Sequence, residues 1–169
     1  EEAFAAYVGT PHACAVSSCT TALHLALLAV GVKPGDVVIT VSHSFIATAN
    51  AIRYCQAEPV FVDVDPVTFN MSPESLRRCL HERCDMRDGK LYSRDVPGLA
   101  VGESPLKQFM NGSAPSVKSS LGRVAAIMPV HQMGMPCDMG SVLSLARQFK
   151  LPVVEDAAQV SHHHRVGDQ

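Results

Sequence analysis

Two carboxylates that follow a short apolar run are the residues best suited to chemistry in this sequence. The run Leu151–Val154 predicts a buried strand, and Glu155 and Asp156 stand at its carboxyl end. Ligands of open parallel sheets bind at that edge. An ionised, buried Asp156 needs a cation or several hydrogen-bond donors, and a protonated pyridine nitrogen is one partner that suits it. Taken alone, Asp156 is equally suited to cap the helix that comes next, because Asp is a preferred N-cap residue.

Hydroxyl side chains gather at a predicted strand-to-helix junction, Ser17–Thr21. The first N–H groups of a helix have no acceptor within the helix, and with the helix dipole they form a site for anions such as phosphate. The hydroxyls of Thr20 and Thr21 would add donors there. The simpler alternative is that Ser17 or Ser18 caps the helix and no anion binds.

Two further side chains follow predicted strands at the binding edge. Phe45 comes after a strand end and a Ser-His-Ser turn, which would leave a face of its ring available for stacking. His131 follows the run Met128–Val130. Taken singly, a core phenylalanine and a structural histidine are the simpler interpretations of these two residues.

A phosphate site, an aromatic face and a strand-end carboxylate together suit a phosphorylated pyridine cofactor. Asp156 would keep the ring nitrogen protonated so that the ring withdraws electrons, as pyridoxal phosphate requires. Gln159 follows Asp156 closely, and from the start of the next helix it is placed to reach the ring hydroxyl. These residues therefore point to pyridoxal 5'-phosphate.

The elements that must position these residues alternate between strand and helix. Apolar runs predict strands at residues 12–16, 37–40, 59–63, 124–129 and 151–154. Helices are predicted over residues 1–7, from 22 to 30, from 46 to 54, after Pro73 and after Asp138. This alternation is typical of βαβ units. The predicted fold is therefore α/β, with a mostly parallel sheet and helices on both faces in three layers.

The segment Glu82–Gly122 interrupts this alternation. It is rich in Gly, Ser, Pro and charge, and its length far exceeds an ordinary connection. Its turn signals are Asp88-Gly89, Pro97-Gly98 and Asn111-Gly112. We expect an irregular surface insertion here, and a lid or an oligomer contact is the functional alternative.

Composition indicates one globular domain. The 169 residues are 47% hydrophobic and 18% charged, with a formal net charge of -2, which suits a single core and disfavours disorder. No long basic run points to nucleic acid. No apolar stretch approaches the roughly 20 residues that span a bilayer, and the first residues do not resemble a signal peptide. We expect neither a nucleic-acid nor a membrane partner.

The cysteines and histidines do not predict a metal site. The six cysteines are scattered and form no C-x-x-C pair, so we expect reduced, mostly buried thiols of a cytoplasmic protein. No spacing of cysteine and histidine matches structural zinc. The tract His162–His164 is not expected to bind metal either, because adjacent side chains diverge on a regular backbone.

Several blocks, in order along the chain, resemble one known family. They are Ala13–Leu27, Pro34–Thr40, Phe45–Ile52, Pro59–Asp65, Pro129–His131 with Gly134, Pro136, Asp138 and Met139, and Glu155–Gln159. These blocks are similar to the DegT/DnrJ/EryC1/StrS family of sugar aminotransferases, which have the aspartate-aminotransferase-like, type I fold of pyridoxal-phosphate enzymes. The similarity omits residues 82–122 and 160–169. It makes residues 1–169 the first part of a cofactor-binding large domain.

The resemblance implies a role for five residues. Thr20 and Thr21 match the phosphate-contacting pair, and Phe45 matches the aromatic residue that stacks on the cofactor ring. Asp156 matches the partner of the pyridine nitrogen, and Gln159 the residue near the ring hydroxyl. The implied reaction moves an amino group, usually from glutamate, to a keto-sugar carried on a nucleotide. The resemblance also implies a homodimer.

The sequence departs from the family after the last matching motif. The family's Schiff-base lysine lies beyond Asp-Ala-Ala-Gln, so we expect it, and the C-terminal domain, after Gln169. The lysines at positions 33, 90, 107, 118 and 150 do not fall at its place. Residues 1–169 alone are therefore expected not to catalyse transamination. A dehydratase of the same family, in which histidine replaces the lysine, and a non-catalytic scaffold or regulatory homologue are the alternatives.

Overall fold

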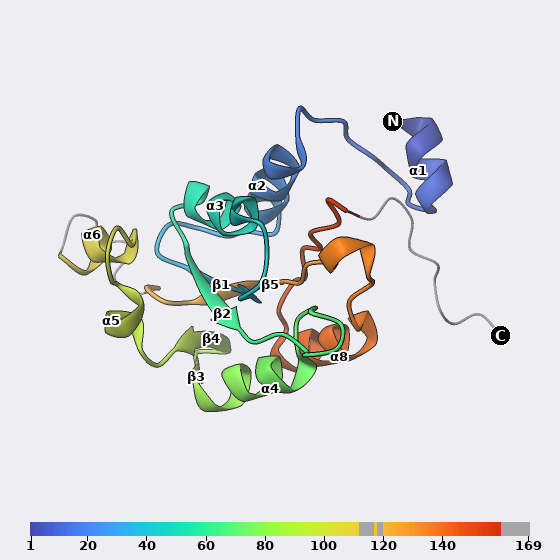
Figure 1. The fold of residues 1–169 in the computed structure, drawn as a ribbon. Helices are drawn as coiled ribbons and strands as arrows, with labels where there is room; N and C mark the ends of the chain where they lie inside the picture. The colour runs from blue at the N-terminus through green and yellow to red at the C-terminus, as the bar shows by residue number, and fades with distance from the viewer. Residues whose placement is uncertain (112–116, 118–119, 160–169) are drawn as a thin grey trace.

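A parallel sheet of three strands forms the centre of the computed structural model, which describes residues 1–111, 117 and 120–159 (Figure 1). The strands are β1 (Val37–Val41), β2 (Glu58–Val62) and β5 (Val124–Met128), in the order β2-β1-β5. Every residue of β1 and β5 is buried, as expected for apolar parallel strands covered on both faces. The predicted strands at 37–40, 59–63 and 124–129 are confirmed.

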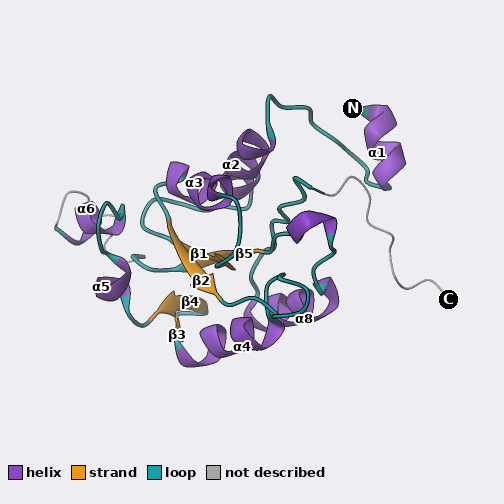
Figure 2. Ribbon diagram, viewed as in Figure 1, coloured by secondary structure: helices purple, strands orange, loops and turns teal. Residues whose placement is uncertain are grey.

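Helices cover both faces of this sheet (Figure 2). α2 (Cys19–Ala29) and α3 (Ile46–Tyr54) lie on one face, and α4 (Pro73–Glu82) and α8 (Met139–Phe149) lie on the other. The three-layer α/β/α prediction is confirmed, including the bounds expected for α3. Within the described ranges, no helix is both long and apolar enough to cross a membrane.

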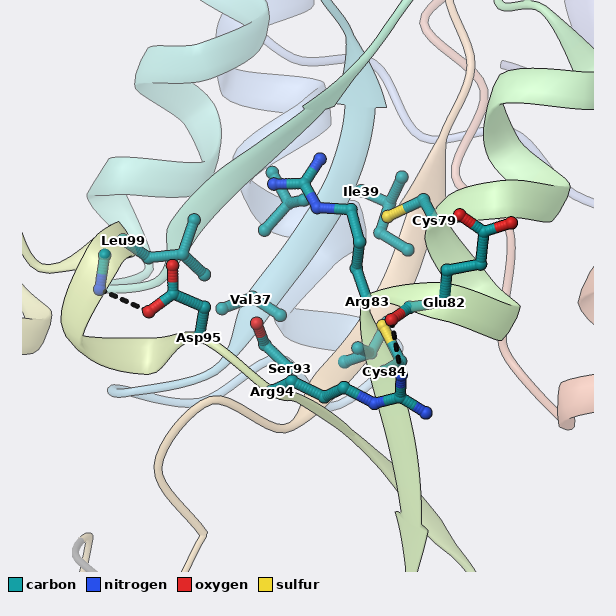
Figure 3. Close-up of a pocket in the computed structure, with 13 residues that line it drawn as sticks. Val37, Ile39, Cys79, Glu82, Arg83, Cys84, Ser93, Arg94, Asp95 and Leu99 are labelled. Carbon is teal, nitrogen blue, oxygen red and sulfur yellow. Dashed lines mark hydrogen bonds between the residues drawn. The ribbon is translucent and has the colours of Figure 1, made fainter.

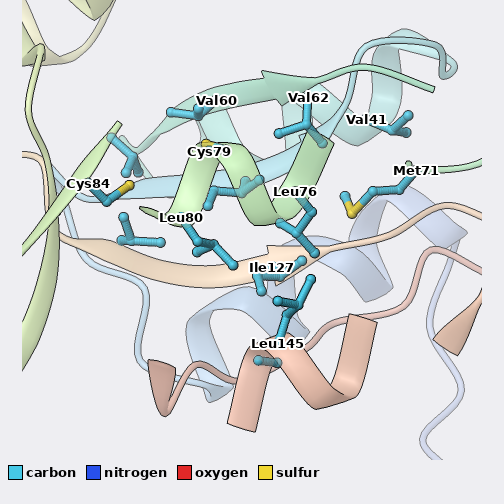
Figure 4. Packing of buried hydrophobic residues seen from close by; sticks show 14 of the residues in the cluster. Val41, Val60, Val62, Met71, Leu76, Cys79, Leu80, Cys84, Ile127 and Leu145 are labelled. Atoms are coloured by element: carbon cyan, nitrogen blue, oxygen red, sulfur yellow. The ribbon is translucent and has the colours of Figure 1, made fainter. Parts of the chain in front are cut away.

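The alternation of side chains along β1 divides the core in two. Ile39 and Val41 belong to the cluster beneath α4 and α8, whereas Val38 belongs to the cluster beneath α2 and α3. In the first cluster, Leu76 and Leu80 of α4 pack toward the sheet (Figure 4). These leucines are one helical turn apart and form the buried face of α4, and the helix predicted after Pro73 is confirmed.

Side-chain caps fix where α2, α4 and α8 begin. In each case the cap oxygen accepts the N–H three residues later, at 3.2 Å for Ser18, 3.2 Å for Ser72 and 3.1 Å for Asp138. The helix predicted after Asp138 is confirmed, and Asp138 is its N-cap. The first helix, α1 (Glu2–Val8), ends at Gly9, whose φ of 71° is the left-handed conformation that favours glycine at this position.

Two predicted strands differ from what the structure shows. Residues 12–16 form no strand, because no neighbouring strand lies beside them among the described residues; the Ala15 N–H instead bonds the Glu1 carboxylate at 2.7 Å. The segment 151–156 lies parallel to β5, as expected, but it joins the sheet through two isolated bridges, Ile127 to Val153 and Val130 to Asp156. It therefore extends the sheet at the carboxyl end without forming a regular strand.

The expectation of an irregular insertion at 82–122 is corrected over much of its length. It contains an antiparallel hairpin, β3 (Cys84–Arg87) and β4 (Lys90–Ser93), and two short helices, α5 (Val96–Leu99) and α6 (Leu106–Met110). The hairpin turn is the Asp88-Gly89 pair, at φ of 49° and 73°, the geometry that such a dipeptide favours. The strands are too short for their apolar pattern to stand out in sequence.

Buried polar contacts anchor this insertion to the sheet. The Glu58 carboxylate at the start of β2 accepts the Ser104 hydroxyl at 2.6 Å and pairs with Arg53 at 2.6 Å. Arg53 in turn donates to the Glu103 carbonyl at 2.9 Å. The insertion is thus held against α3 and the edge strand β2.

Candidate functional site

A cavity of about 240 Å³ opens at the carboxyl ends of the strands. Its walls come from the start of α2, from the loop between β1 and α3 with the first turn of α3, from the residues after β5, and from the end of the 151–156 segment. The lining residues are Cys19, Thr20, Leu23, Ser44, Phe45, Ala47, Thr48, Val130, His131, Gln132, Asp156, Ala158 and Gln159. The fold therefore places this cavity at the edge where ligands of parallel α/β sheets bind.

Asp156 is the buried charge of the cavity, and only 5% of it is exposed. Its Oδ2 accepts the Thr48 hydroxyl at 2.7 Å. Its Oδ1 accepts the Ala158 N–H at 3.3 Å and the Cys19 thiol at 3.8 Å. None of the ion pairs in the described part of the chain involves Asp156. This carboxylate is held by neutral donors, so it is suited to a cationic group of a ligand.

The first turn of α2 supplies backbone donors to the same cavity. The Thr21 N–H is taken by Ser18 Oγ and the Ala22 N–H by Ser18 O. Within the described ranges the N–H groups of Cys19 and Thr20 have no acceptor. Free N–H groups at the positive end of a helix dipole attract a phosphate, and Thr20 lines the cavity beside them.

Four of the five predicted site residues line the cavity, and Thr21 does not. Phe45 is the N-cap of α3 and lines the cavity with 76% of its surface exposed, which leaves a ring face accessible. Gln159 also lines the cavity. Thr21 does not, because its hydroxyl bonds the hydroxyls of Ser17 at 3.2 Å and Ser18 at 3.0 Å. Contacts of these residues with a cofactor stay predictions.

His131 combines the two interpretations that its sequence position allowed. It is fully buried and lines the cavity. Its Nδ1 accepts the Cys137 N–H at 2.9 Å, so in the neutral ring the proton lies on Nε2, which is 3.2 Å from the Glu155 carboxylate. The Asp156 carbonyl accepts the His131 N–H at 3.1 Å. The residue thus ties the loop after β5 to the end of the 151–156 segment.

Sequence reasoning missed Thr48, which makes the shortest contact with Asp156. Thr48 lies three residues after Phe45, one turn further along α3 on the same side. That spacing is the signal that could have placed it in the cavity once Phe45 was chosen. Cys19 was also missed. Burial, and then the nearby Asp156 charge, raise the pKa of the Cys19 thiol.

A second cavity, of about 270 Å³, lies between the sheet and the hairpin and contains none of the predicted site residues (Figure 3). Val37 and Ile39 of β1 line its floor, and Arg83 and Cys84 line its side. The Cys84 thiol hydrogen-bonds to the Cys79 thiol, which lowers the pKa of Cys79. All six cysteines are free thiols, as predicted, with two of them exposed.

The described residues contain no group of three or more metal-binding side chains. The tract His162–His164 lies outside the described residues.

Comparison with known proteins matches the chain to one family. The sequence model of the DegT/DnrJ/EryC1/StrS aminotransferase family matches residues 1–86 and 115–168. The unmatched residues between them form part of the insertion, including β4, α5 and α6.

Individual relatives agree with this match. GDP-perosamine synthase of Caulobacter vibrioides is 40% identical over 159 residues, which are 94% of this chain and 32% of that protein. The spore coat polysaccharide biosynthesis protein SpsC of Bacillus subtilis is 38% identical over 158 residues, 94% of this chain and 30% of that protein. NtdA of Bacillus subtilis, solved with bound cofactor PMP, is 27% identical with a TM-score of 0.68, covering 96% of this chain and 28% of that one. The chain spans about a third of the length of these relatives and belongs to the DegT/DnrJ/EryC1/StrS aminotransferase family.

Proposed function

We propose that this chain is the first part of a pyridoxal-phosphate-dependent aminotransferase that transfers an amino group, with glutamate as donor, to a keto-sugar carried on a nucleotide. Family membership and the PMP-bound relative point to pyridoxal 5'-phosphate as the cofactor. The name of the Caulobacter relative, GDP-perosamine synthase, supports a nucleotide-linked amino sugar as the product. A homodimer in the cytoplasm remains part of the proposal.

The observation that carries the proposal is that Asp156, which forms no ion pair within the described residues, shares its cavity with free N–H groups that can bind a phosphate. The carboxylate has neutral partners alone among the described residues. The free N–H groups of Cys19 and Thr20 lie at the start of α2 in the same cavity. A ligand that carries a cationic ring at one end and a phosphate at the other satisfies both, and pyridoxal 5'-phosphate is such a ligand.

The residues of this chain would hold the cofactor and tune it. When bound, the cofactor supplies a ring that withdraws electrons from the carbon bearing the amino group. Asp156 would keep a proton on the ring nitrogen, and Thr20 with the α2 N–H groups would bind the phosphate. Phe45 would cover one face of the ring, and Gln159 would bond the ring hydroxyl. Thr21 would add a phosphate contact if its hydroxyl turned from the two serines.

A binding titration with pyridoxamine 5'-phosphate tests the proposal. The ligand binds without a covalent link, so the chain can be used as it stands. We expect Asp156→Asn, which keeps the shape of the side chain and removes its charge, to weaken binding by about 2 kcal/mol, roughly 30-fold. Asp138→Asn is the matched control, since Asp138 caps α8 outside the cavity.

The proposal fails if the unaltered chain does not bind the ligand in calorimetry, or if Asp156→Asn binds it as well as Asp138→Asn does. The amino-transfer step is tested separately in the longer protein that carries this chain. There, glutamate should convert bound pyridoxal 5'-phosphate to the pyridoxamine form, seen as a change in cofactor absorbance. An unchanged spectrum would favour the dehydratase or the non-catalytic alternative.

A further inference from the structure

We infer that Thr48 is a positioning residue for Asp156: its hydroxyl, itself oriented by Ser44, holds the carboxylate so that its charge faces the ring nitrogen of the bound cofactor. This inference rests on the proposed function. It concerns the chain's own residues, and neither hydroxyl was assigned a role by the sequence motifs.

The hydrogen bonds between these side chains have a fixed direction. Thr48 is only 2% exposed, and its Oγ1 lies 2.7 Å from Asp156 Oδ2 and 2.6 Å from Ser44 Oγ. An ionised carboxylate can only accept, so Thr48 must donate to Asp156. Its remaining lone pairs then accept the hydrogen of the Ser44 hydroxyl. The chain of donors runs from Ser44 through Thr48 to Asp156.

Thr48 is the dominant partner of the carboxylate. The two contacts to Oδ1, from Ala158 and Cys19, are 3.3 Å and 3.8 Å long, and thiols are weak donors. A hydrogen bond to a charged group is stronger than one between neutral groups. Without the Thr48 hydroxyl, the buried carboxylate would keep only its long contacts and would be free to turn its charge away from the cavity.

The backbone of α3 makes Thr48 a stiff support. The Thr48 N–H donates to the Phe45 carbonyl at 3.1 Å, so the first turn of the helix links this hydroxyl to the exposed aromatic ring. A β-branched side chain in a helix has few χ1 rotamers, which limits how far the hydroxyl can move. One turn of helix thus sets both the direction of the carboxylate and the place of the stacking ring.

Two ligands and a matched pair of variants test this role. Thr48→Val keeps the branched shape and removes the hydroxyl. Thr40→Val is the control, because Thr40 is also fully buried and donates to a backbone carbonyl, that of Met128 at 2.8 Å, outside the cavity. The ligands are pyridoxamine 5'-phosphate and its 1-deaza analogue, in which a C–H group replaces the ring nitrogen.

Dissociation constants from calorimetry should separate a role at the nitrogen from a general one. We expect Thr48→Val to weaken binding of pyridoxamine 5'-phosphate about 10-fold or more and to leave the affinity for the deaza analogue within about twofold of the unaltered chain. Thr40→Val should change neither affinity. Thr48→Ser, which restores a hydroxyl, should recover most of the loss.

Three other results would overturn the inference, each for a different reason. If the unaltered chain does not bind pyridoxamine 5'-phosphate, the proposed function fails and the inference fails with it. If it binds and Thr48→Val behaves like Thr40→Val, the inference alone is overturned. Equal loss for both ligands would make Thr48 a structural residue of the cavity. Should Thr48→Val not fold, as judged by circular dichroism, Thr48→Ala gives the same comparison.

Discussion

Neutral donors around the Asp156 carboxylate stabilise its charge without cancelling it. A lysine or arginine at hydrogen-bonding distance would both stabilise the carboxylate and neutralise its charge. The cavity would then no longer attract a cationic ring. The Thr48 hydroxyl at 2.7 Å and the weaker contacts from Ala158 and Cys19 instead leave the negative charge available. At the scale of single residues, neutral donors are therefore what the proposed binding of a cationic ring requires of this cavity.

The Cys19 thiol should report the charge of Asp156. Burial and the carboxylate raise the pKa of Cys19, so less of it is thiolate at pH 8 and iodoacetamide should alkylate it slowly. Asp156→Asn removes the carboxylate contribution and should increase the alkylation rate of Cys19 by about threefold. The rate is measured by peptide mass spectrometry at several pH values.

The exposed Cys14 is the internal control, since no carboxylate contact is found for it within the described ranges. Its alkylation rate should be the same in both proteins. An unchanged rate at Cys19 in Asp156→Asn would show that the carboxylate does not act on the thiol.

Much of the cavity could be predicted from residue types at strand ends. The hydroxyl of Thr48, which lies inside a helix, could not be predicted in this way. Asp156, Phe45 and Thr20 follow an apolar run or begin a helix, Gln159 follows Asp156 closely, and the structure brings all four to one cavity. Thr48 lies within a helix, where a threonine has no distinctive pattern and only packing shows which way its hydroxyl points. Its contact with Asp156 depends on tertiary structure.

At the scale of elements, local sequence sufficed where an element carries a clear apolar pattern of its own. β1 and β5 are continuous apolar runs, and α4 has one apolar face, so each was predictable from its own residues. Residues 12–16 are also apolar, but a strand needs a neighbour, and the described residues offer none. The hairpin β3–β4 had the opposite difficulty, because its turn was evident and its four-residue strands were not.

An ion pair joins the starts of the neighbouring strands β1 and β5, at the edge of the sheet away from the cavity. Arg123, before β5, donates to the Asp36 carboxylate before β1 at 2.9 Å and 2.5 Å, and to the Gly31 carbonyl at 2.9 Å. Asp36 is buried, and its hydrogen bond raises the pKa of Arg123. This pair fixes how β1 and β5 start side by side.

Removing the guanidinium should destabilise the sheet strongly. We expect Arg123→Met to lower the free energy of unfolding by about 3 kcal/mol, because Asp36 would remain as an uncompensated buried charge. Urea unfolding measures the change. The control is Arg77→Met, whose exposed pair with Glu74 at 3.1 Å should contribute less than about 1 kcal/mol. Similar losses for the two variants would contradict the structural role of the Arg123–Asp36 pair.

At the scale of the whole molecule, the cavity and the insertion lie at different parts of the sheet. The carboxyl edge carries the family's motifs and the cavity with Asp156. The hairpin and the two short helices extend from the other side, where the family model has no counterpart for residues 87–114. The architecture shared with the family thus explains the cavity, and the insertion, anchored through Glu58 to β2, is a feature of this chain beyond the family match.

The most direct test of the proposed cofactor site is the protonation state of the bound ring. Pyridoxamine 5'-phosphate labelled with ¹⁵N at the ring nitrogen, bound to the chain, should show the chemical shift of a protonated nitrogen at a pH where the free ligand has lost that proton. In Asp156→Asn the bound nitrogen should show the shift of the unprotonated form at the same pH. If the unaltered chain bound the ligand with an unprotonated nitrogen, Asp156 would not be its partner and the central claim would be contradicted.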